Sequence, residues 1–442
     1  PNKKLIFQLV LSMKNTLERF LHSQSTGAII LFFAAILAFF WANSPWSNLY
    51  YHLSHLDLGI HFHGQQYHLS LGHWVKDGLM TIFFFVVGLE IKREVVVGEL
   101  SDPRKMILPI AAALGGSICP ALIYYFFNVS GEALHGWGIP MATDIAFALG
   151  ILALFGKRVP LGLKIFLTAL AIVDDLLAIL VIAFFYTASI NISALILAIF
   201  LLGVLSWVVR RGIHQPGIHL PLAFSIWLCI LLSGIHATIA GVLIAMVYPV
   251  RASIKPEVFF AIIKKRIALL EQSGLTEESM IDNKKQLQAI NTIYVTTRDM
   301  IPAGIALEDS LHSVQAFVIL PLFALFSAGV TVNTAMFSDF TGTISLGIIL
   351  GLLLGKQVGI LGASFVVMKL SLAKLDPLIN LKQIWGVSLL AGIGFTMSIF
   401  IAELAFTQES MINEAKLAIF VASILSAVLG AVVLHKVLPP KP

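Results

Sequence analysis

The chain of 442 residues is 58% hydrophobic and only 12% charged, with a formal net charge of +5. Soluble globular domains carry about 25% charged residues. This composition therefore excludes a water-soluble fold of this size, which would lack the polar side chains to cover its surface. The small net charge gives no reason to expect a nucleic-acid partner. The two cysteines, Cys119 and Cys229, lie in apolar runs, where we expect small core residues and neither a disulfide nor a metal site.

The N-terminal segment 1–25 is predicted to be an amphipathic helix on the membrane surface. It holds cationic residues around an apolar stretch that is too short to span a bilayer. Residues 26–437 are predicted to form a single all-α, polytopic transmembrane domain, because apolar runs near the length of about 20 residues needed for a crossing recur along it. The twelve predicted spans are 26–43, 74–98, 106–128, 138–155, 160–187, 192–210, 221–233, 236–250, 312–332, 343–368, 385–406 and 416–437.

Two longer connections differ from the spans. In the outer loop 44–73, residues 56–71 alternate apolar and polar side chains around His63-Gly64-Gln65-Gln66, and this pattern predicts a small β-hairpin. Residues 251–306 have mixed charge and are predicted to form a long, partly helical cytoplasmic loop.

The positions of the cations indicate the orientation of the chain. With the N-terminus inside, all of the 29 Lys and Arg residues except Lys76, Lys356 and Lys416 fall on the inner side or in the inner tails. Such an asymmetry is typical of cytoplasmic segments. It therefore predicts a multi-pass protein with both termini in the cytoplasm.

Two of the predicted spans are interrupted by glycine. The first contains Gly138-Ile-Pro-Met-Ala-Thr-Asp144, and the second contains Gly392-Ile-Gly-Phe-Thr-Met-Ser398. They occupy the centres of two similar segments, 106–187 and 343–437, which run in opposite directions by the span count and so predict inverted repeats. Paired interrupted helices indicate a transporter's binding site. The alternative is that glycine is simply common in membrane helices.

Four ionisable residues lie deep inside predicted spans: Asp144, Asp174, Asp175 and Lys356. Asp174 is about 21 Å along its helix from residue 160, which is mid-membrane. Each such charge costs about 2.5–3.5 kcal/mol on insertion scales, so these residues are functional candidates. The alternative is a structural ion pair between one Asp and Lys356, which would leave two carboxylates unexplained.

The adjacent pair Asp174-Asp175 predicts the chemistry. Neighbours on a helix point about 100° apart, so both carboxylates can border one cavity. Burial and mutual repulsion favour their protonated forms, whereas the ionised carboxylates offer hard oxygen ligands to a small cation. Protons and the cation would then compete for the same oxygens, which is what an exchanger requires.

The remaining candidates support this site or lie near the membrane surfaces. Asp144 and Lys356 are expected to neutralise the opposed ends of the interrupted helices, and Thr143 and Thr396 to supply oxygen atoms. Glu90 and Glu94 lie at the inner end of the second span and form either a solvated rim or a pH-responsive cluster. His236 opens the eighth span and is either interfacial or functional. We expect Glu403 to be solvated near the outer surface.

Several motifs closely resemble the bacterial NhaA family of sodium/proton antiporters, over about residues 20–437. They are Met141-Ala-Thr-Asp-Ile-Ala-Phe-Ala-Leu-Gly150, the run from Leu163 to Asp174-Asp175, Gly88-Leu-Glu-Ile-Lys-Arg-Glu94, Ser233-Gly-Ile-His-Ala-Thr238, Gly355-Lys356 and Gly392-Ile-Gly-Phe-Thr-Met397.

The resemblance implies a fold of twelve helices, two of them interrupted and crossing, in a bacterial inner membrane. It implies that Asp174 and Asp175 carry the transported Na⁺ (or Li⁺) and protons, that the cycle is electrogenic, and that the chain forms a homodimer through the outer hairpin. It also implies a pH response at four positions: Glu90, Glu94, His236 and Glu308. No cofactor is expected.

Two features depart from the family pattern: the stretch 251–306 is longer than usual, and Ser327 replaces an Asn found in many members.

Three other functions remain as alternatives. An intramembrane aspartyl protease needs its acids on separate helices in distinct motifs. A symporter of an organic anion needs a positive site, whereas three acids and one lysine favour a cation. A passive channel has less use for paired acids that hold protons.

Overall fold

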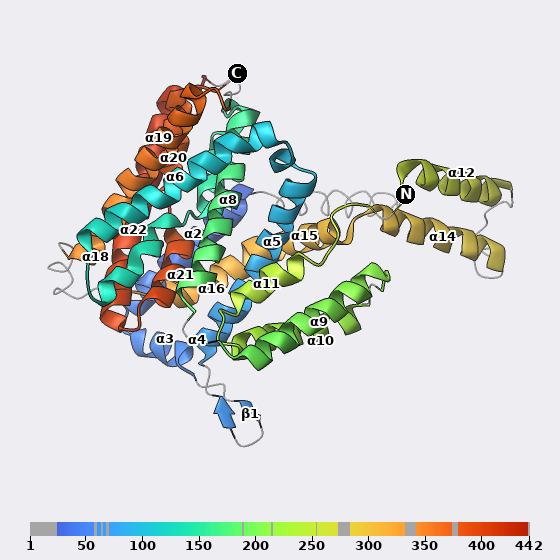
Figure 1. The fold of residues 1–442 in the computed structure, drawn as a ribbon, viewed down its shortest axis with the longest axis horizontal. Coiled ribbons are helices and arrows are strands. Elements are labelled where there is room, and N and C mark those ends of the chain that lie inside the picture. Colours follow the sequence, from blue (N-terminus) through green and yellow to red (C-terminus); the bar gives the residue numbers. More distant parts are fainter. Residues whose placement is uncertain are drawn as a thin grey trace, which may run out of the picture.

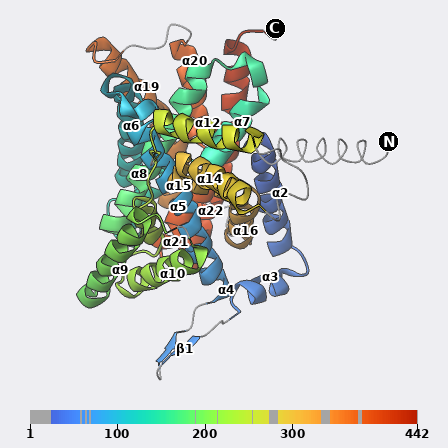
Figure 2. The ribbon, with the colours of Figure 1, turned by 90° about the vertical axis from the view of Figure 1, so that its right-hand side faces the viewer.

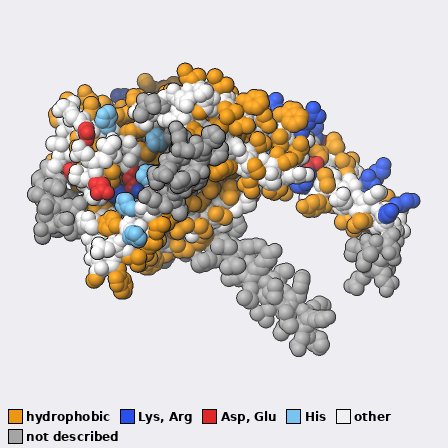
Figure 3. Space-filling model, turned by 90° about the horizontal axis from the view of Figure 1, so that it is seen from below, with side chains coloured by type: hydrophobic (Ala, Val, Ile, Leu, Met, Phe, Trp, Pro, Cys, Tyr) orange, Lys and Arg blue, Asp and Glu red, His pale blue; other side chains and the backbone are white. Residues whose placement is uncertain are grey.

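The computed structural model describes residues 24–440 except 57–59, 63–64, 68–69, 188–189, 214, 253, 273–282, 332–341 and 374–378. The predicted amphipathic segment 1–25 lies almost wholly outside the described residues. The described part is dominated by helices that pack side by side into one bundle (Figure 1). Many large apolar side chains are exposed, among them Phe126, Phe184 and Leu220, as expected for a protein surrounded by lipid. The view from below in Figure 3 shows hydrophobic side chains interspersed with polar and charged ones.

The first half of the chain forms helices that include the first of the two interrupted spans. In chain order these elements are α2 (Gln24–Ala42), α3 (Ser47–Ser54), α4 (Leu71–His73), the π-helix η1 (Trp74–Leu79), α5 (Met80–Val96), the 3₁₀ turn η2 (Glu99–Ser101), α6 (Pro103–Phe127), the 3₁₀ helix η3 (Glu132–Met141), α7 (Ile145–Leu154), η4 (Gly156–Arg158), α8 (Leu161–Phe185), α9 (Ile192–Arg210), α10 (Pro216–Leu232) and α11 (Thr238–Ala245).

The second half begins with two helices outside the bundle and then returns to it. Its elements are α12 (Pro256–Gln272), α14 (Lys284–Met300), α15 (Ala303–Val314), the π-helix η5 (Gln315–Ile319), α16 (Leu320–Ser327), α18 (Thr343–Leu350), the π-helix η6 (Gly351–Gly355), α19 (Lys356–Lys369), α20 (Leu381–Ala391), α21 (Phe395–Ala405) and α22 (Glu409–Val437).

Eight helices of the described chain are long and apolar enough to cross a membrane, or up to nine if the bent pair α20–α21 is one span. The protein is therefore a multi-pass membrane protein. The predicted number of twelve is not reached by this measure, although each predicted range contains helix. The reasons are local: α11 has only 8 residues, α10 has 17, and α5 has 17, four of them charged residues near its C-terminal end.

The segment predicted to lie on the outer side contains two short antiparallel strands, β1 (Ile60–Phe62) and β2 (Gln65–Tyr67), with Ile60 opposite Tyr67. They lie within the segment where the hairpin was predicted, and His63-Gly64 between them lies outside the described residues. The strands project beyond the ends of the helices, at the bottom of Figures 1 and 2.

The predicted loop 251–306 contains α12 and α14, which pack against each other and project from one side of the bundle (Figure 1). Helix α15 begins at Ala303, so the ninth span starts earlier than its predicted residue 312. Lys and Arg side chains are visible on this projecting arm in Figure 3.

Glycines bring α6 and α19 into close contact. A methyl group added to Gly359 would overlap the backbone of Gly115, and one added to Gly355 would overlap Pro120. Small residues let membrane helices approach closely and gain packing energy. This contact, together with the π-helical turn η6 that ends at Gly355, sets the position of Lys356 at the first residue of α19.

Candidate functional site

The two interrupted helices meet at their breaks. The first passes from η3 to α7 through residues 142–144, and the second bends by 46° between α20 and α21. The backbone N–H of Asp144 donates to the carbonyl oxygen of Ile393 at 2.6 Å, which joins the two breaks directly. Helix η3 packs against α21, and α7 packs against α20, so the two interrupted helices cross at this point.

Asp144 caps two helices at once. Its Oδ1 accepts a hydrogen bond from the backbone N–H of Phe147 in α7 at 3.1 Å, and its Oδ2 accepts one from the N–H of Thr396 in α21 at 3.0 Å. The hydroxyl of Thr396 also donates to Oδ2. A helix N-terminus carries a partial positive charge and unpaired N–H groups. One buried carboxylate therefore accepts hydrogen bonds at the N-termini of both helices.

Asp174 is held by three donors. The hydroxyl of Ser117 donates to its Oδ1 at 2.8 Å, and the hydroxyl of Thr143 lies 2.6 Å from its Oδ2. The ammonium group of Lys356 donates to the same Oδ2 and forms an ion pair in which both side chains are fully buried. Thr143 also lies 2.8 Å from the carbonyl oxygen of Ala391. Its single hydroxyl proton can serve only one of these acceptors at a time.

Asp175 is equally buried, with 1% of its surface exposed, but its surroundings differ. Its Oδ2 has no hydrogen-bond partner among the residues that the structure describes. A buried carboxylate without a partner is costly when ionised. The group is therefore suited to hold a proton, or to bind a cation that enters the site.

Lys356 was predicted to neutralise a helix end together with Asp144. Among the described residues, its Nζ donates to Asp174. The ion pair weighed as an alternative in the sequence is thus present, but it involves Asp174 alone. Within the described chain, Asp144 and Asp175 take part in no ion pair.

A second charged group, named the inner cluster because the sequence predicts that it faces the cytoplasm, lies at the C-terminal end of α5. Arg93 donates to Glu308 of α15 at 3.0 and 3.1 Å and to Glu94 at 2.6 Å. Glu90 lies one turn before Glu94 on the same helix, so the structure brings these three acids together around one arginine. His236 does not join them, because it lies just before the first residue of α11. The inner cluster lies beside the other end of that helix, where Lys92 donates a hydrogen bond to the carbonyl oxygen of Met246 at 2.7 Å.

Comparison with known proteins shows the family of the chain. The family model for Na⁺/H⁺ antiporter 1 matches residues 18–434. The chain belongs to this family. It is 44% identical over 421 residues to the Na⁺/H⁺ antiporter NhaA 1 of Saccharophagus degradans, which covers 95% of this chain and 91% of that protein. It is also 44% identical to the Na⁺/H⁺ antiporter NhaA of Oleidesulfovibrio alaskensis (95% and 93% covered) and 42% identical to NhaA 1 of Clostridium beijerinckii (95% of each).

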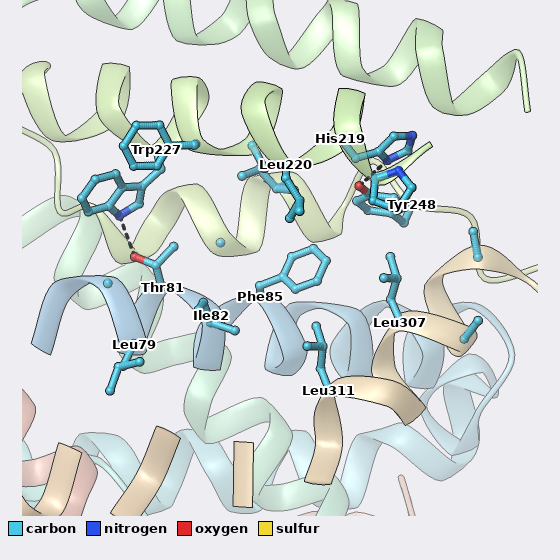
Figure 4. A pocket seen from close by; sticks show the side chains of 18 of the residues that line it. Leu79, Thr81, Ile82, Phe85, His219, Leu220, Trp227, Tyr248, Leu307 and Leu311 are labelled. Carbon is cyan, nitrogen blue, oxygen red and sulfur yellow. Dashed lines mark hydrogen bonds between the residues drawn. The ribbon is translucent and has the colours of Figure 1, made fainter. Parts of the chain in front are cut away.

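As a member of this antiporter family, the chain is a transporter, and Na⁺ and H⁺ are the ions that the family exchanges. A large cavity in the described chain is a different feature from the acidic site. That cavity has a volume of about 1010 Å³ and lies between α5, α10, α11 and α15 (Figure 4). Phe85 and Leu311 point into it, and its lining includes no acidic side chain.

Two polar residues of this antiporter were missed or misjudged in the sequence. Ser117 contacts Asp174. The only feature of the sequence that could have indicated this residue is its hydroxyl group in the glycine-rich middle of a predicted span. Glu403 was expected to be solvated, which is wrong: its side chain is 12% exposed and pairs with Lys76 and Lys416, both at 2.7 Å. The error has a physical cause: both lysines come from other helices, and the spacing of residues in the sequence does not show that these helices meet at Glu403.

Proposed function

We propose that the protein exports Na⁺, or Li⁺, from the cytoplasm in exchange for protons, and that Asp174 and Asp175 carry both. The buried carboxylate of Asp175, whose Oδ2 has no hydrogen-bond partner among the described residues, is the observation that supports this proposal most directly. It lies beside a second carboxylate whose present partner is a lysine, so the two acids together can offer several oxygen ligands to a hard cation. Proton and cation then compete for Asp175.

The charges of the site indicate an electrogenic cycle. In the proton-loaded state both carboxylates are protonated and Lys356 keeps its charge, so the three groups together carry one positive charge. A Na⁺ ion that binds both ionised carboxylates displaces both protons, and the site with its sodium ion and the lysine ammonium is then neutral. The two loaded states differ by two protons and one sodium ion. Net positive charge therefore enters the cell in each cycle, driven by the membrane potential.

Four residues would support the site without carrying the ions. Asp144 compensates the two helix ends, and Thr396 positions that carboxylate. Thr143 can shift its hydroxyl proton between Asp174 and the carbonyl of Ala391 as the charge on Asp174 changes. Lys356 would act as the mobile counter-charge.

We further propose that the inner cluster adjusts transport to cytoplasmic pH. Glu90, Glu94 and Glu308 compete for the guanidinium group of Arg93, and protonation of one of them would redistribute these ion pairs. His236, which lies apart from the cluster, would contribute through α11 and not by direct contact.

The remaining parts of the proposal concern the whole molecule in the membrane. We propose twelve crossings arranged as inverted repeats in a bacterial inner membrane, with both termini in the cytoplasm. The lysine and arginine distribution supports this orientation. We also propose a homodimer in which the outer hairpin around residues 56–71 of each copy contacts the other.

Transport in everted membrane vesicles with an internal pH dye tests the exchange. Adding sodium to pre-acidified vesicles should raise the internal pH, and Asp175→Asn should abolish the response, because an amide neither ionises nor exchanges a proton. Asp309→Asn, a change at an exposed aspartate of α15, should keep it. Normal exchange by Asp175→Asn would refute the assignment. In proteoliposomes, a rate that does not respond to membrane potential would refute the electrogenic cycle.

A further inference from the structure

Glu403 connects three helices through one carboxylate oxygen. Its Oε1, near the outer end of α21, lies 2.7 Å from Nζ of Lys76 in η1 and 2.7 Å from Nζ of Lys416 in α22. The exposed fractions of the side chains are 12% for Glu403, 26% for Lys76 and 8% for Lys416. Two cations thus share one carboxylate at a largely dry position. A sodium/proton exchange site does not require this arrangement.

The two ion pairs differ in what they join. Helix α22 packs against α18, α20 and α21, so the Lys416–Glu403 pair lies within the group of helices that contains the breaks. Lys76 lies in η1, directly before α5. The main packing partner of α5 is α11, which lies on the side of the molecule that also holds α9 and α10 (Figure 1). The Lys76–Glu403 pair therefore connects the two sides of the bundle.

We propose that the Lys76–Glu403 ion pair is a releasable latch that holds the outer side of the molecule closed. The inference rests on the proposed exchange, since an exchanger must open its site alternately to each side of the membrane. Release leaves no unpaired buried carboxylate, because Glu403 keeps its contact with Lys416. Lys76 is the most exposed of the three residues, so water can replace the contact that it loses.

The latch also has a direct connection to the site. Glu403 and Thr396 are seven residues apart on α21, which places them on the same side of the helix two turns apart. Thr396 holds Asp144 at the crossing of the breaks. A shift of α21 that accompanies release is therefore transmitted to the helix end that Asp144 caps.

Crosslinking tests whether the contact must open. Cys119 and Cys229 are free thiols and are first replaced by Ala. In that background, joining Lys76→Cys to Glu403→Cys with a short bismaleimide should stop exchange in proteoliposomes. The matched pair, Glu403→Cys with Lys416→Cys, lies within one group of helices and should keep the rate that it has before crosslinking. Full exchange by the crosslinked 76–403 protein would overturn the latch.

A single substitution provides a second test that does not depend on the cysteine variants. In Lys76→Met, the apparent KM for sodium measured on the outer face, divided by that on the inner face, should fall at least about threefold, because the outward-open state gains population. Lys105→Met removes an exposed ion pair with Glu99 and should leave the ratio unchanged. An unchanged ratio in Lys76→Met overturns the latch. No sodium/proton exchange by the unmodified chain would instead overturn the proposed function.

Discussion

Asp174 and Asp175 are neighbours in the chain but have opposite surroundings. Side chains one residue apart on a helix point about 100° away from each other. Asp174 consequently faces α6 and α19, where Ser117 and Lys356 meet it, while Oδ2 of Asp175 lacks a partner in the described chain. The two acids therefore differ in what ionisation costs them. We expect substitutions at the two positions to have different effects on stability.

Removing the lysine should destabilise the protein. Lys356→Met leaves the carboxylate of Asp174 buried without its counter-charge, and breaking such a pair costs about 3–5 kcal/mol. We expect a clear fall in the Tm measured in detergent, together with loss of exchange. The double variant Lys356→Met/Asp174→Asn removes both charges, so it should recover most of the Tm but not the transport.

The comparison of single and double variants separates two interpretations of the ion pair. A double variant that is no more stable than Lys356→Met would show that the lysine stabilises the fold by packing alone. Asp175→Asn serves as the control, because it replaces a carboxylate that has no ion-pair partner among the described residues, and it should leave the Tm unchanged or raise it.

At the scale of helices, the contact between α6 and α19 determines where the lysine can reach. Gly359 lies against the backbone of Gly115, with no room for a side chain between them. Gly359→Ala should therefore push the helices apart, cost about 1–3 kcal/mol and reduce transport by moving Lys356 away from Asp174. Gly362→Ala, on the same helix, meets no heavy atom within 4 Å and should be neutral. Equal Tm values for the two variants would contradict this explanation.

Sequence patterns predicted the parts of the fold that depend on local composition. The apolar runs gave the helices, and Gly138, Pro140 and Gly392 indicated the two breaks. The contacts made by single atoms were not predictable, because they depend on how distant helices pack. Examples are the capping of two helices by Asp144 and the choice of Asp174 as the partner of Lys356.

The number and length of the spans were less predictable than their existence. Helix α11 has only 8 residues because the chain turns at Ser233 and Gly234 and enters α11 only at Thr238. Glu403 shows the same limit at the outer surface. Its partners come from η1 and α22, so only the assembled bundle reveals that this glutamate is buried.

At the scale of the whole molecule, the outer strands offer a test of the proposed dimer. Replacing residues 60–67 with a short Gly-Ser linker removes the surface that two copies would share, and the site lies elsewhere. We expect the mass measured by light scattering in detergent to fall from dimer to monomer while exchange in proteoliposomes persists. An unchanged dimer mass would place the interface on another surface.

The projecting arm of α12 and α14 has a practical consequence. These helices pack mainly against each other and stand apart from the crossing of the breaks (Figure 1). Antibody fragments or fusion partners attached to their exposed faces would add recognisable mass for electron cryomicroscopy without touching the ion path. This arm is thus a convenient handle for imaging the transporter at work.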